Sequence, residues 1–169
     1  MLGFDSLKEE SKKIIHPIPP LFGENSRVLI LGSFPSVKSR EQSFFYGHPQ
    51  NRFWRVISAV FEKDLPQTVA EKTQLIKNCD LALWDVIASC EITGSDDSSI
   101  KNVVANDISG ILKNSKINRI FVNGKTAEKY YIKYIEKKVG IKAICLPSTS
   151  PANAAYSLEK LIDKWSVIK

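Results

Sequence analysis

The chain has 169 residues, of which 43% are hydrophobic, and its formal net charge is +6. This length suffices for one domain with a full hydrophobic core that needs neither disulfides nor metal to stabilise it. No apolar run approaches the ~18 residues of a membrane span, and the N-terminal lysines lack the apolar segment of a signal peptide. We therefore expect a single, monomeric, cytoplasmic domain over residues 1–169 that does not contact membranes.

The charge and the cysteines limit the class of partner and cofactor. A basic chain favours a polyanionic partner such as nucleic acid, although lysines along a helix are also typical of a solvated face. Cys79, Cys90 and Cys145 are far apart and form no CxxC pair. This spacing argues against zinc or an iron–sulfur cluster and favours reduced thiols. We expect no cofactor and no metal.

The first predicted elements are a helix and a strand. Residues 5–15 contain helix formers behind two candidate caps, Asp5 and Ser6, and the prolines that follow His16 end this helix. The apolar run over 27–31 stops abruptly at Gly-Ser and indicates a buried strand.

The rest of the chain alternates strands with helices. Residues 85–99 are polar and predict a long connection. The other predicted elements are strands over about 79–84, 118–122 and 141–146, and helices over about 49–62, 66–77, the latter half of 100–114, 125–138 and about 154–165. This alternation indicates a parallel sheet covered on both faces, an α/β fold with a three-layer α/β/α sandwich.

The connection between the first strand and the helix after it is unusually long, since about two to six residues usually suffice there. It holds three consecutive aromatic residues (44–46) and one of the two histidines, His48, ahead of Pro49 at the predicted helix start. Asn51 falls in the first turn of that helix. Long loops at the carboxyl ends of strands are where open α/β sheets keep their sites.

Polar residues follow each of the four predicted strands and should meet at one edge of the sheet. The sequences there are Gly32-Ser-Phe-Pro-Ser, Trp84-Asp85, Asn123-Gly-Lys and Leu146-Pro-Ser-Thr-Ser-Pro-Ala-Asn. Each also has a structural interpretation: Asp85 as a cap, Asn123-Gly124 as a turn pair, and Asn153 as the N-cap of the last helix. Their convergence beside an aromatic loop favours a nucleic-acid site, because aromatic rings stack on bases while hydroxyl and backbone N–H groups bind phosphates. The chain contains neither GxGxxG nor a phosphate-loop lysine motif.

Together these motifs resemble the uracil-DNA glycosylase superfamily and, within it, the hypoxanthine (deoxyinosine) DNA glycosylase branch. The resemblance covers about residues 16–165, and the HPxNxFW and LPSTSPANA segments are its most specific parts. The matching segments are Leu31-Gly-Ser-Phe-Pro-Ser, Tyr46-Gly-His-Pro-Gln-Asn-Arg-Phe-Trp, Leu83-Trp-Asp-Val, Gly94-Ser-Asp-Asp, Asn123-Gly-Lys-Thr and Leu146-Pro-Ser-Thr-Ser-Pro-Ala-Asn-Ala.

The resemblance implies a four-stranded parallel sheet in the order 2-1-3-4, with a base pocket at its carboxyl edge. It also implies base flipping, because a base inside a duplex must be extruded before its glycosidic bond can be reached. Many relatives carry Asp or Asn two residues after the first-motif glycine to position the attacking water, and here that residue is Phe34. In the hypoxanthine branch the task belongs to the HPxN asparagine, which is Asn51. His48 either assists Asn51 or caps the helix.

The reaction implied by the resemblance assigns the remaining residues. Backbone N–H groups over 32–36 would hold the base, one aromatic ring would stack on it, and a carboxylate would accept the N1–H of hypoxanthine. The residues expected to contact the base are Gly32, Ser33, Phe34, Phe45, Tyr46 and Asp85. The residues expected to contact DNA are Ser36, Ser148 and Ser150 at phosphates, Pro151 and Asn153 in a minor-groove wedge, and Lys125, which is equally typical of an exposed helix lysine.

We therefore expect a monofunctional DNA glycosylase that removes deaminated bases, chiefly hypoxanthine, from DNA without a lysine nucleophile. A uracil or thymine mismatch-specific glycosylase of the same superfamily is the nearest alternative. A non-catalytic DNA- or nucleotide-binding module on this fold is the second. Duplexes that contain hypoxanthine, uracil or xanthine would separate the two enzymes, and a binding module would leave no alkali-labile abasic sites.

Overall fold

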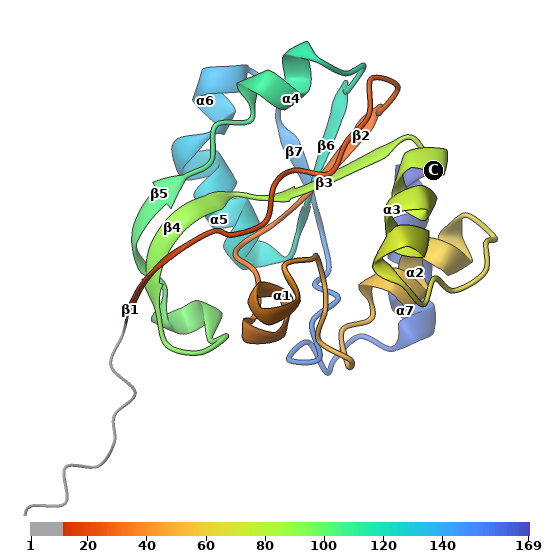
Figure 1. Ribbon diagram of the computed structural model, residues 1–169, viewed down its shortest axis with the longest axis horizontal. Helices are drawn as coiled ribbons and strands as arrows, with labels where there is room; N and C mark the ends of the chain where they lie inside the picture. The colour runs from red at the N-terminus through yellow and green to blue at the C-terminus, as the bar shows by residue number, and fades with distance from the viewer. Residues whose placement is uncertain (1–11) are drawn as a thin grey trace, which may run out of the picture.

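Figure 1 shows the computed structural model of the chain, which describes residues 12–169, as three layers. The middle layer is a parallel sheet of four strands in the order β3-β2-β6-β7. In chain order this is 2-1-3-4, which confirms the topology that the resemblance implied. The strands are β2 (Val28–Gly32), β3 (Leu81–Asp85), β6 (Arg119–Asn123) and β7 (Ala143–Leu146).

Strand β2 lies inside this sheet, and all of its residues are buried. Its side chains alternate between the two faces: Val28 and Ile30 join the core on one side, and Leu29 and Leu31 join the core on the other. A strand covered on both faces can be apolar throughout, which explains the continuous run of aliphatic residues. The strand ends at Gly32, which lies next to Asp85 of β3.

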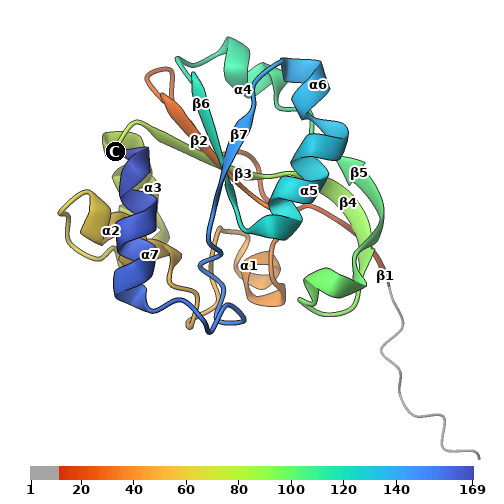
Figure 2. The same ribbon diagram turned by 180° about the vertical axis from the view of Figure 1, so that it is seen from behind.

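Helices cover both faces of the central sheet. Figure 1 shows α2 (Phe53–Val60), α3 (Val69–Asn78) and α7 (Leu158–Trp165) on one side. Figure 2 shows α5 (Lys125–Tyr134), α6 (Glu136–Val139) and α4 (Ser109–Lys113) on the other. The three-layer α/β/α prediction is therefore confirmed. The short elements are α1 (Val37–Gln42) and the 3-10 helices η1 (Asp97–Ser99) and η2 (Ser166–Ile168).

A second, antiparallel sheet was not predicted. It consists of β1 (Lys12–Ile15), β4 (Ile87–Ile92) and β5 (Lys101–Ala105) in the order β1-β4-β5. The prediction of a polar connection over 85–99 was therefore wrong, because its first half pairs on both sides as β4. Residues 12–15 were predicted to be helical and instead pair with β4, so tertiary pairing outweighs local helix propensity there. The rest of the predicted N-terminal helix, 5–11, lies outside the described residues.

Helix boundaries shift for identifiable reasons. Helix α2 begins at Phe53 rather than near Pro49, because residues 48–50 form a turn ahead of it. Helix α7 begins at Leu158 and is capped by Ser157, so the interpretation of Asn153 as its N-cap was wrong. The predicted helix over 125–138 is divided at Ile135 into α5 and α6. Among residues 12–169, no helix is both long and apolar enough to cross a bilayer.

Candidate active site

A cavity of ≈ 430 Å³ opens at the carboxyl ends of the central strands. Its wall combines segments that are far apart in the sequence, including 32–36, 95–97 and 148–152, with single residues from the aromatic loop. Every residue predicted for the site lines this cavity except Lys125 and Asn153. Segments 32–36 and 148–152 meet because parallel strands place their carboxyl ends at one edge, whereas segment 95–97 comes from the loop after β4.

The two exceptions have different positions. Lys125 is exposed in the first turn of α5. The side-chain amide of Asn153 donates to the carbonyl oxygen of Ser148 at 3.0 Å and stabilises the loop that follows β7.

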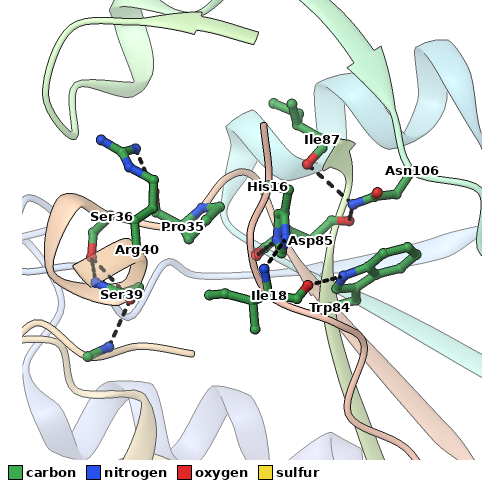
Figure 3. Close-up of polar contacts among 11 residues, drawn as sticks. His16, Ile18, Pro35, Ser36, Ser39, Arg40, Trp84, Asp85, Ile87 and Asn106 are labelled. Carbon is green, nitrogen blue, oxygen red and sulfur yellow. Dashed lines mark hydrogen bonds and ion pairs between the residues drawn. The ribbon is translucent and has the colours of Figure 1, made fainter. Parts of the chain in front are cut away.

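The floor of the cavity is formed by Gly32 and Asp85, and behind it lies His16. Nε2 of His16 is 2.7 Å from Oδ2 of Asp85, and the two side chains are 3% and 7% exposed. Figure 3 shows the imidazole between this carboxylate and the backbone of Ile18. The interpretation of Asp85 as a cap was wrong, because its carboxylate contacts a histidine 69 residues away.

The hydrogen bonds of His16 determine its tautomer. Nδ1 accepts the backbone N–H of Ile18 at 3.1 Å, so this nitrogen carries no proton. Nε2 must therefore be the protonated nitrogen of the neutral ring, and it donates to Asp85. The indole of Trp84 donates to the carbonyl of Ile18 at 2.9 Å and holds the same segment against β3. The carboxylate is thus bound at Oδ2 and presents Oδ1 toward Gly32.

The aromatic loop contributes less stacking surface than expected. Phe45 is buried at 3% exposed, and its carbonyl accepts the indole N–H of Trp54 at 3.2 Å. The ring of Tyr46 stacks on Phe53 with centroids 3.9 Å apart. Its hydroxyl is buried and has no hydrogen-bond partner among residues 12–169. Both residues line the cavity, and the buried hydroxyl of Tyr46 lies 3.3 Å from the position that a Cβ on Gly32 would take.

Asn51 belongs to a hydrogen-bond network that fixes its amide. Its Oδ1 accepts the backbone N–H of Phe53 and the hydroxyl of Thr149, each at 2.9 Å. The hydroxyl of Thr149 accepts in turn from Nδ2 of Asn123 at 3.0 Å. Thr149 is fully buried, and its backbone N–H donates to Oδ1 of Asn123 at 3.1 Å. With its oxygen occupied twice, Asn51 has its Nδ2 hydrogens available for other acceptors.

Arg52 attaches the aromatic loop to the loop after β7. Its guanidinium donates to the carbonyls of Ser150 and Asn153 at 2.9 and 3.0 Å, and also to the carbonyl of Tyr156. Its backbone N–H donates to Thr149 at 3.1 Å. The HPxNxFW and LPSTSPANA segments are therefore one structural unit.

The serines of the site are held in turns. Ser148 and Ser150 accept the backbone N–H groups of Ser150 and Ala152 at 3.1 and 3.2 Å. Each hydroxyl keeps its own O–H donor, which is the group a phosphate oxygen would need. Ser36 caps α1 by accepting from the backbone N–H of Ser39.

His48 does not cap α2. Its Nδ1 accepts the backbone N–H of Gln50 at 3.1 Å and stabilises the turn ahead of that helix. The alternative that His48 caps the helix was therefore wrong, because Asn51 supplies the side-chain acceptor there.

A second carboxylate lines the cavity. The hydroxyl of Ser33 lies 3.3 Å from each carboxylate oxygen of Asp97. Loss of hydration raises the pKa of the Asp97 carboxyl more than this hydrogen bond lowers it, and the charges of Asp85 and Asp96 raise it further. Among residues 12–169, no three His, Cys, Asp or Glu side chains lie close enough together to bind a metal ion.

Comparisons of sequence and of structure relate this chain to DNA glycosylases. Residues 19–168 match the family model described as the uracil DNA glycosylase superfamily. Two curated relatives named hypoxanthine DNA glycosylase are similar in sequence. The Methanosarcina acetivorans protein is 35% identical over 89% of this chain and 94% of its own length, and the Methanosarcina barkeri protein is 34% identical over 88% and 93%.

A solved structure agrees with the sequence comparisons. It is a solution NMR structure of a candidate uracil DNA glycosylase from Methanosarcina acetivorans, with a TM-score of 0.77 and 31% identity. The alignment covers 92% of this chain and 97% of that one.

The chain belongs to the uracil DNA glycosylase superfamily. Within that superfamily fold, Phe34 occupies the position at which the resemblance expects a water-positioning group. It is 8% exposed and packs edge-on against His16, with ring centroids 5.9 Å apart. Phe34 therefore builds the wall of the cavity and cannot bind water through its side chain.

Sequence reasoning missed several residues of this superfamily site. His16, Arg52 and Thr149 act through partners that are 69 to 104 residues away. His16 did carry one signal. It is one of only two histidines in the chain, and it directly precedes a proline-rich segment. Asp97 lies in the matched Gly94-Ser-Asp-Asp segment, but nothing in that segment indicates that its side chain reaches the cavity.

Proposed function

We propose that this chain is a monofunctional DNA glycosylase that hydrolyses the bond between deoxyribose and hypoxanthine in DNA. The observation that carries the proposal is the Asp85 carboxylate, whose oxygen Oδ1 is free at the floor of the cavity while His16 binds Oδ2. Superfamily membership and the names of the two curated relatives support the same activity.

Recognition would begin with base flipping, because the cavity can only be filled by a nucleotide that has left the stack. Hypoxanthine carries a proton at N1, and a carboxylate oxygen accepts it. Adenine carries a bare N1 lone pair, which the same oxygen repels. The Asp85 carboxylate therefore separates the deaminated purine from its parent.

The departing base needs stabilisation of negative charge. The backbone N–H groups of Ser33 and Phe34 follow directly after β2 and have no acceptor within residues 12–169. Donors of this kind are effective when they are fixed before the reaction, since no reorganisation is then required. They are suited to a nitrogen or oxygen of the leaving base.

The attacking water would be held by Asn51. Because Oδ1 of Asn51 is occupied by Phe53 and Thr149, its Nδ2 hydrogens are the groups that can bind the water oxygen. An amide orients water but is a poor base, so the proposal requires a dissociative reaction with an oxocarbenium-like sugar. Positioning alone can supply much of the rate when the attacking atom is well aligned.

The flanking phosphates would be bound by the hydroxyls of Ser148 and Ser150, with Lys125 at the edge of the site. Both serines are half-buried and are held in turns, so their O–H groups can point out of the loop. Pro151 is exposed beside them, where a wedge would enter the minor groove. DNA containing deaminated bases is thus the proposed partner, inside the cell.

The experiment is a single-turnover assay with matched duplexes that contain hypoxanthine, uracil, xanthine or adenine. We expect alkali-labile sites chiefly in the hypoxanthine duplex. A preference for uracil would instead identify the mismatch-type enzyme, and binding without cleavage would identify a binding module. Borohydride should trap no protein–DNA adduct, because a Schiff base requires an amine nucleophile and none is proposed.

A further inference from the structure

The two oxygens of Asp85 have different surroundings. Oδ2 accepts from Nε2 of His16 at 2.7 Å. Oδ1 lies so close to Gly32 that a Cβ on this residue would overlap it. A base that enters the cavity therefore meets one carboxylate oxygen, while the other is already bound from behind.

His16 cannot easily release that oxygen. Its ring accepts from Ile18 on the other nitrogen, and it packs edge-on against Phe34 and Trp84 with centroids 5.9 and 6.1 Å away. Rotation of the ring would break both hydrogen bonds at once. The imidazole thus keeps the carboxylate in one orientation.

The hydroxyl of Tyr46 lies at the same place. It is 3.3 Å from the position that a Cβ on Gly32 would take, and it is buried without a partner among residues 12–169. Burial, and then the charge of Asp85, raise the pKa of Tyr46 more than the nearby side chain of Asn123 lowers it, so the hydroxyl keeps its proton at neutral pH. A buried donor without an acceptor is costly, and a ligand that accepts from it recovers that cost.

The backbone supports the same interpretation. Tyr46 has a φ of 51°, which is rare for a bulky residue. Its stacking on Phe53 and the hydrogen bond from the N–H of Gly47 to Ser39, at 2.9 Å, hold this strained conformation. Strain of this kind persists where the surrounding structure fixes it, and it is concentrated at functional sites.

We propose that His16 is a positioning residue that leaves Asp85 only one oxygen to accept a hydrogen bond from a base. This acceptor and the neighbouring Tyr46 hydroxyl donor together select bases that carry one N–H beside one carbonyl. The inference rests on the proposed function and names the substrate class of the same site. Hypoxanthine presents N1–H to Oδ1 of Asp85 and O6 to the hydroxyl of Tyr46.

The arrangement also explains how the site would reject guanine, an abundant base that resembles hypoxanthine. Guanine shares N1–H and O6 with hypoxanthine but adds an amino group next to N1. A free carboxylate would bind N1–H and the amino group with its two oxygens. With Oδ2 bound by His16, that amino group loses the second carboxylate oxygen as its acceptor, and a poorly paired polar group is a basis for rejection.

Two variants of His16 form a matched test. His16→Leu removes both ring hydrogen bonds, whereas His16→Gln offers a donor for Asp85 and an acceptor for Ile18. Single-turnover excision is measured with duplexes that contain hypoxanthine or guanine opposite thymine. We expect the ratio of hypoxanthine to guanine excision to fall about tenfold or more in the leucine variant and to recover in the glutamine variant.

Tyr46→Phe tests the other half of the pair and removes only an oxygen without a partner, so folding should be preserved. Unsubstituted purine, which lacks both N1–H and O6, is the comparison base. Excision of hypoxanthine should fall about tenfold more than excision of purine. Melting temperatures of all variants accompany the rates.

The possible failures are distinguishable. If the wild type does not excise hypoxanthine, the proposed function is wrong. If it does, and a folded leucine variant keeps the wild-type ratio, the role of His16 is overturned while the proposed function stands. If the leucine variant does not fold, Tyr46→Phe decides, and equal losses with both bases would overturn the donor–acceptor pair.

Discussion

The hydroxyl of Thr149 donates to Oδ1 of Asn51 at 2.9 Å and joins two loops that are 98 residues apart in the sequence. This hydroxyl must donate to Asn51 because an amide oxygen can only accept, and it accepts in turn from Nδ2 of Asn123. The amide of Asn51 is therefore oriented by protein groups before DNA arrives. Such preorganisation is what a site needs if positioning is its main contribution to the rate.

Thr149→Val should weaken both stability and rate. The substitution keeps the shape of the side chain but leaves Nδ2 of Asn123 without its acceptor in a buried position, at a cost of about 1–3 kcal/mol in unfolding free energy. The amide of Asn51 also loses one of its two fixed donors. Thr149→Ser retains the hydroxyl and is the matched control. Urea unfolding and single-turnover excision check the result, and a valine variant equal to the serine variant in both would contradict it.

Asn51→Ala should lose about two to four orders of magnitude in single-turnover rate, the scale of one positioned catalytic group. Its stability should fall as well, because the backbone N–H of Phe53 and the hydroxyl of Thr149 both lose an acceptor. Asn51→Asp keeps that acceptor oxygen and should melt near the wild type. Its second oxygen can also hold water, so its rate should lie between wild type and alanine. A stable aspartate variant as slow as alanine would exclude water binding at this position.

The sequence predicted the central sheet well because its signals are local. A short aliphatic run that ends at Gly-Ser, such as Val28–Leu31, favours a strand buried on both faces. The strand ends then placed Gly32, Asp85 and Asn123 at one edge, where the cavity lies. The family resemblance added the strand order, which no local pattern determines.

The missed features depend on contacts distant in sequence. Residues 12–15 have a composition that suits a helix, yet pairing with β4 makes them a strand. Tyr46 or Phe45 was expected to stack on the base, but Phe53 occupies one face of the Tyr46 ring and Phe45 is buried. Asp85 could be interpreted from the sequence either as a helix cap or as a residue that contacts the base. The hydrogen bond from His16 argues against the cap, and neither the segment around His16 nor strand β3 indicates by itself that the two meet.

Gly32→Ala should disable the pocket. The new methyl group would overlap Oδ1 of Asp85 and lie 3.3 Å from the hydroxyl of Tyr46. Since His16 holds the carboxylate, it cannot simply rotate away, and we expect a loss of about 1–3 kcal/mol in stability, as for other overpacked sites. The rate of hypoxanthine excision should also fall when it is measured at a temperature at which the variant is fully folded. Gly110→Ala, where a Cβ meets nothing within 4 Å, is the control, and equal activity in both variants would exclude a close approach of the base to Gly32.

Asp97→Asn should raise the melting temperature at neutral pH. Asp97 is exposed overall, yet partial loss of hydration at its carboxyl raises its pKa above 3.8, so the folded state binds a proton somewhat more tightly than the unfolded state does and the gain should be small. An acid of this kind reduces stability above its folded pKa, and the penalty disappears as the pH falls through that value toward 3.8. The gain from asparagine should therefore be present at pH 7 and absent near pH 3. Melting curves across this range test it, and a gain independent of pH would assign the effect to packing.

Asp85→Asn should replace the acceptor at the floor of the cavity with a donor. Nε2 of His16 donates, so the amide oxygen of asparagine must occupy the place of Oδ2, at 2.7 Å in the wild type. The amide N–H₂ then faces the base and opposes the N1–H of hypoxanthine. An unmatched group of this kind in a buried pocket costs about 1–3 kcal/mol, or roughly 5- to 150-fold in rate. Uracil presents carbonyl oxygens beside its N–H and can shift to use the new donor.

The measurement for Asp85→Asn is the ratio of hypoxanthine to uracil excision in otherwise identical duplexes, together with a thermal melt. We expect slower hypoxanthine excision and a ratio that moves toward uracil, with a smaller change in melting temperature than removal of the acceptor would cause. Asp85→Ala is the matched control, because it leaves His16 without any acceptor and should destabilise the protein more. A ratio that stays at the wild-type value in a folded Asp85→Asn variant would remove Asp85 from base recognition and leave it only as the anchor of His16.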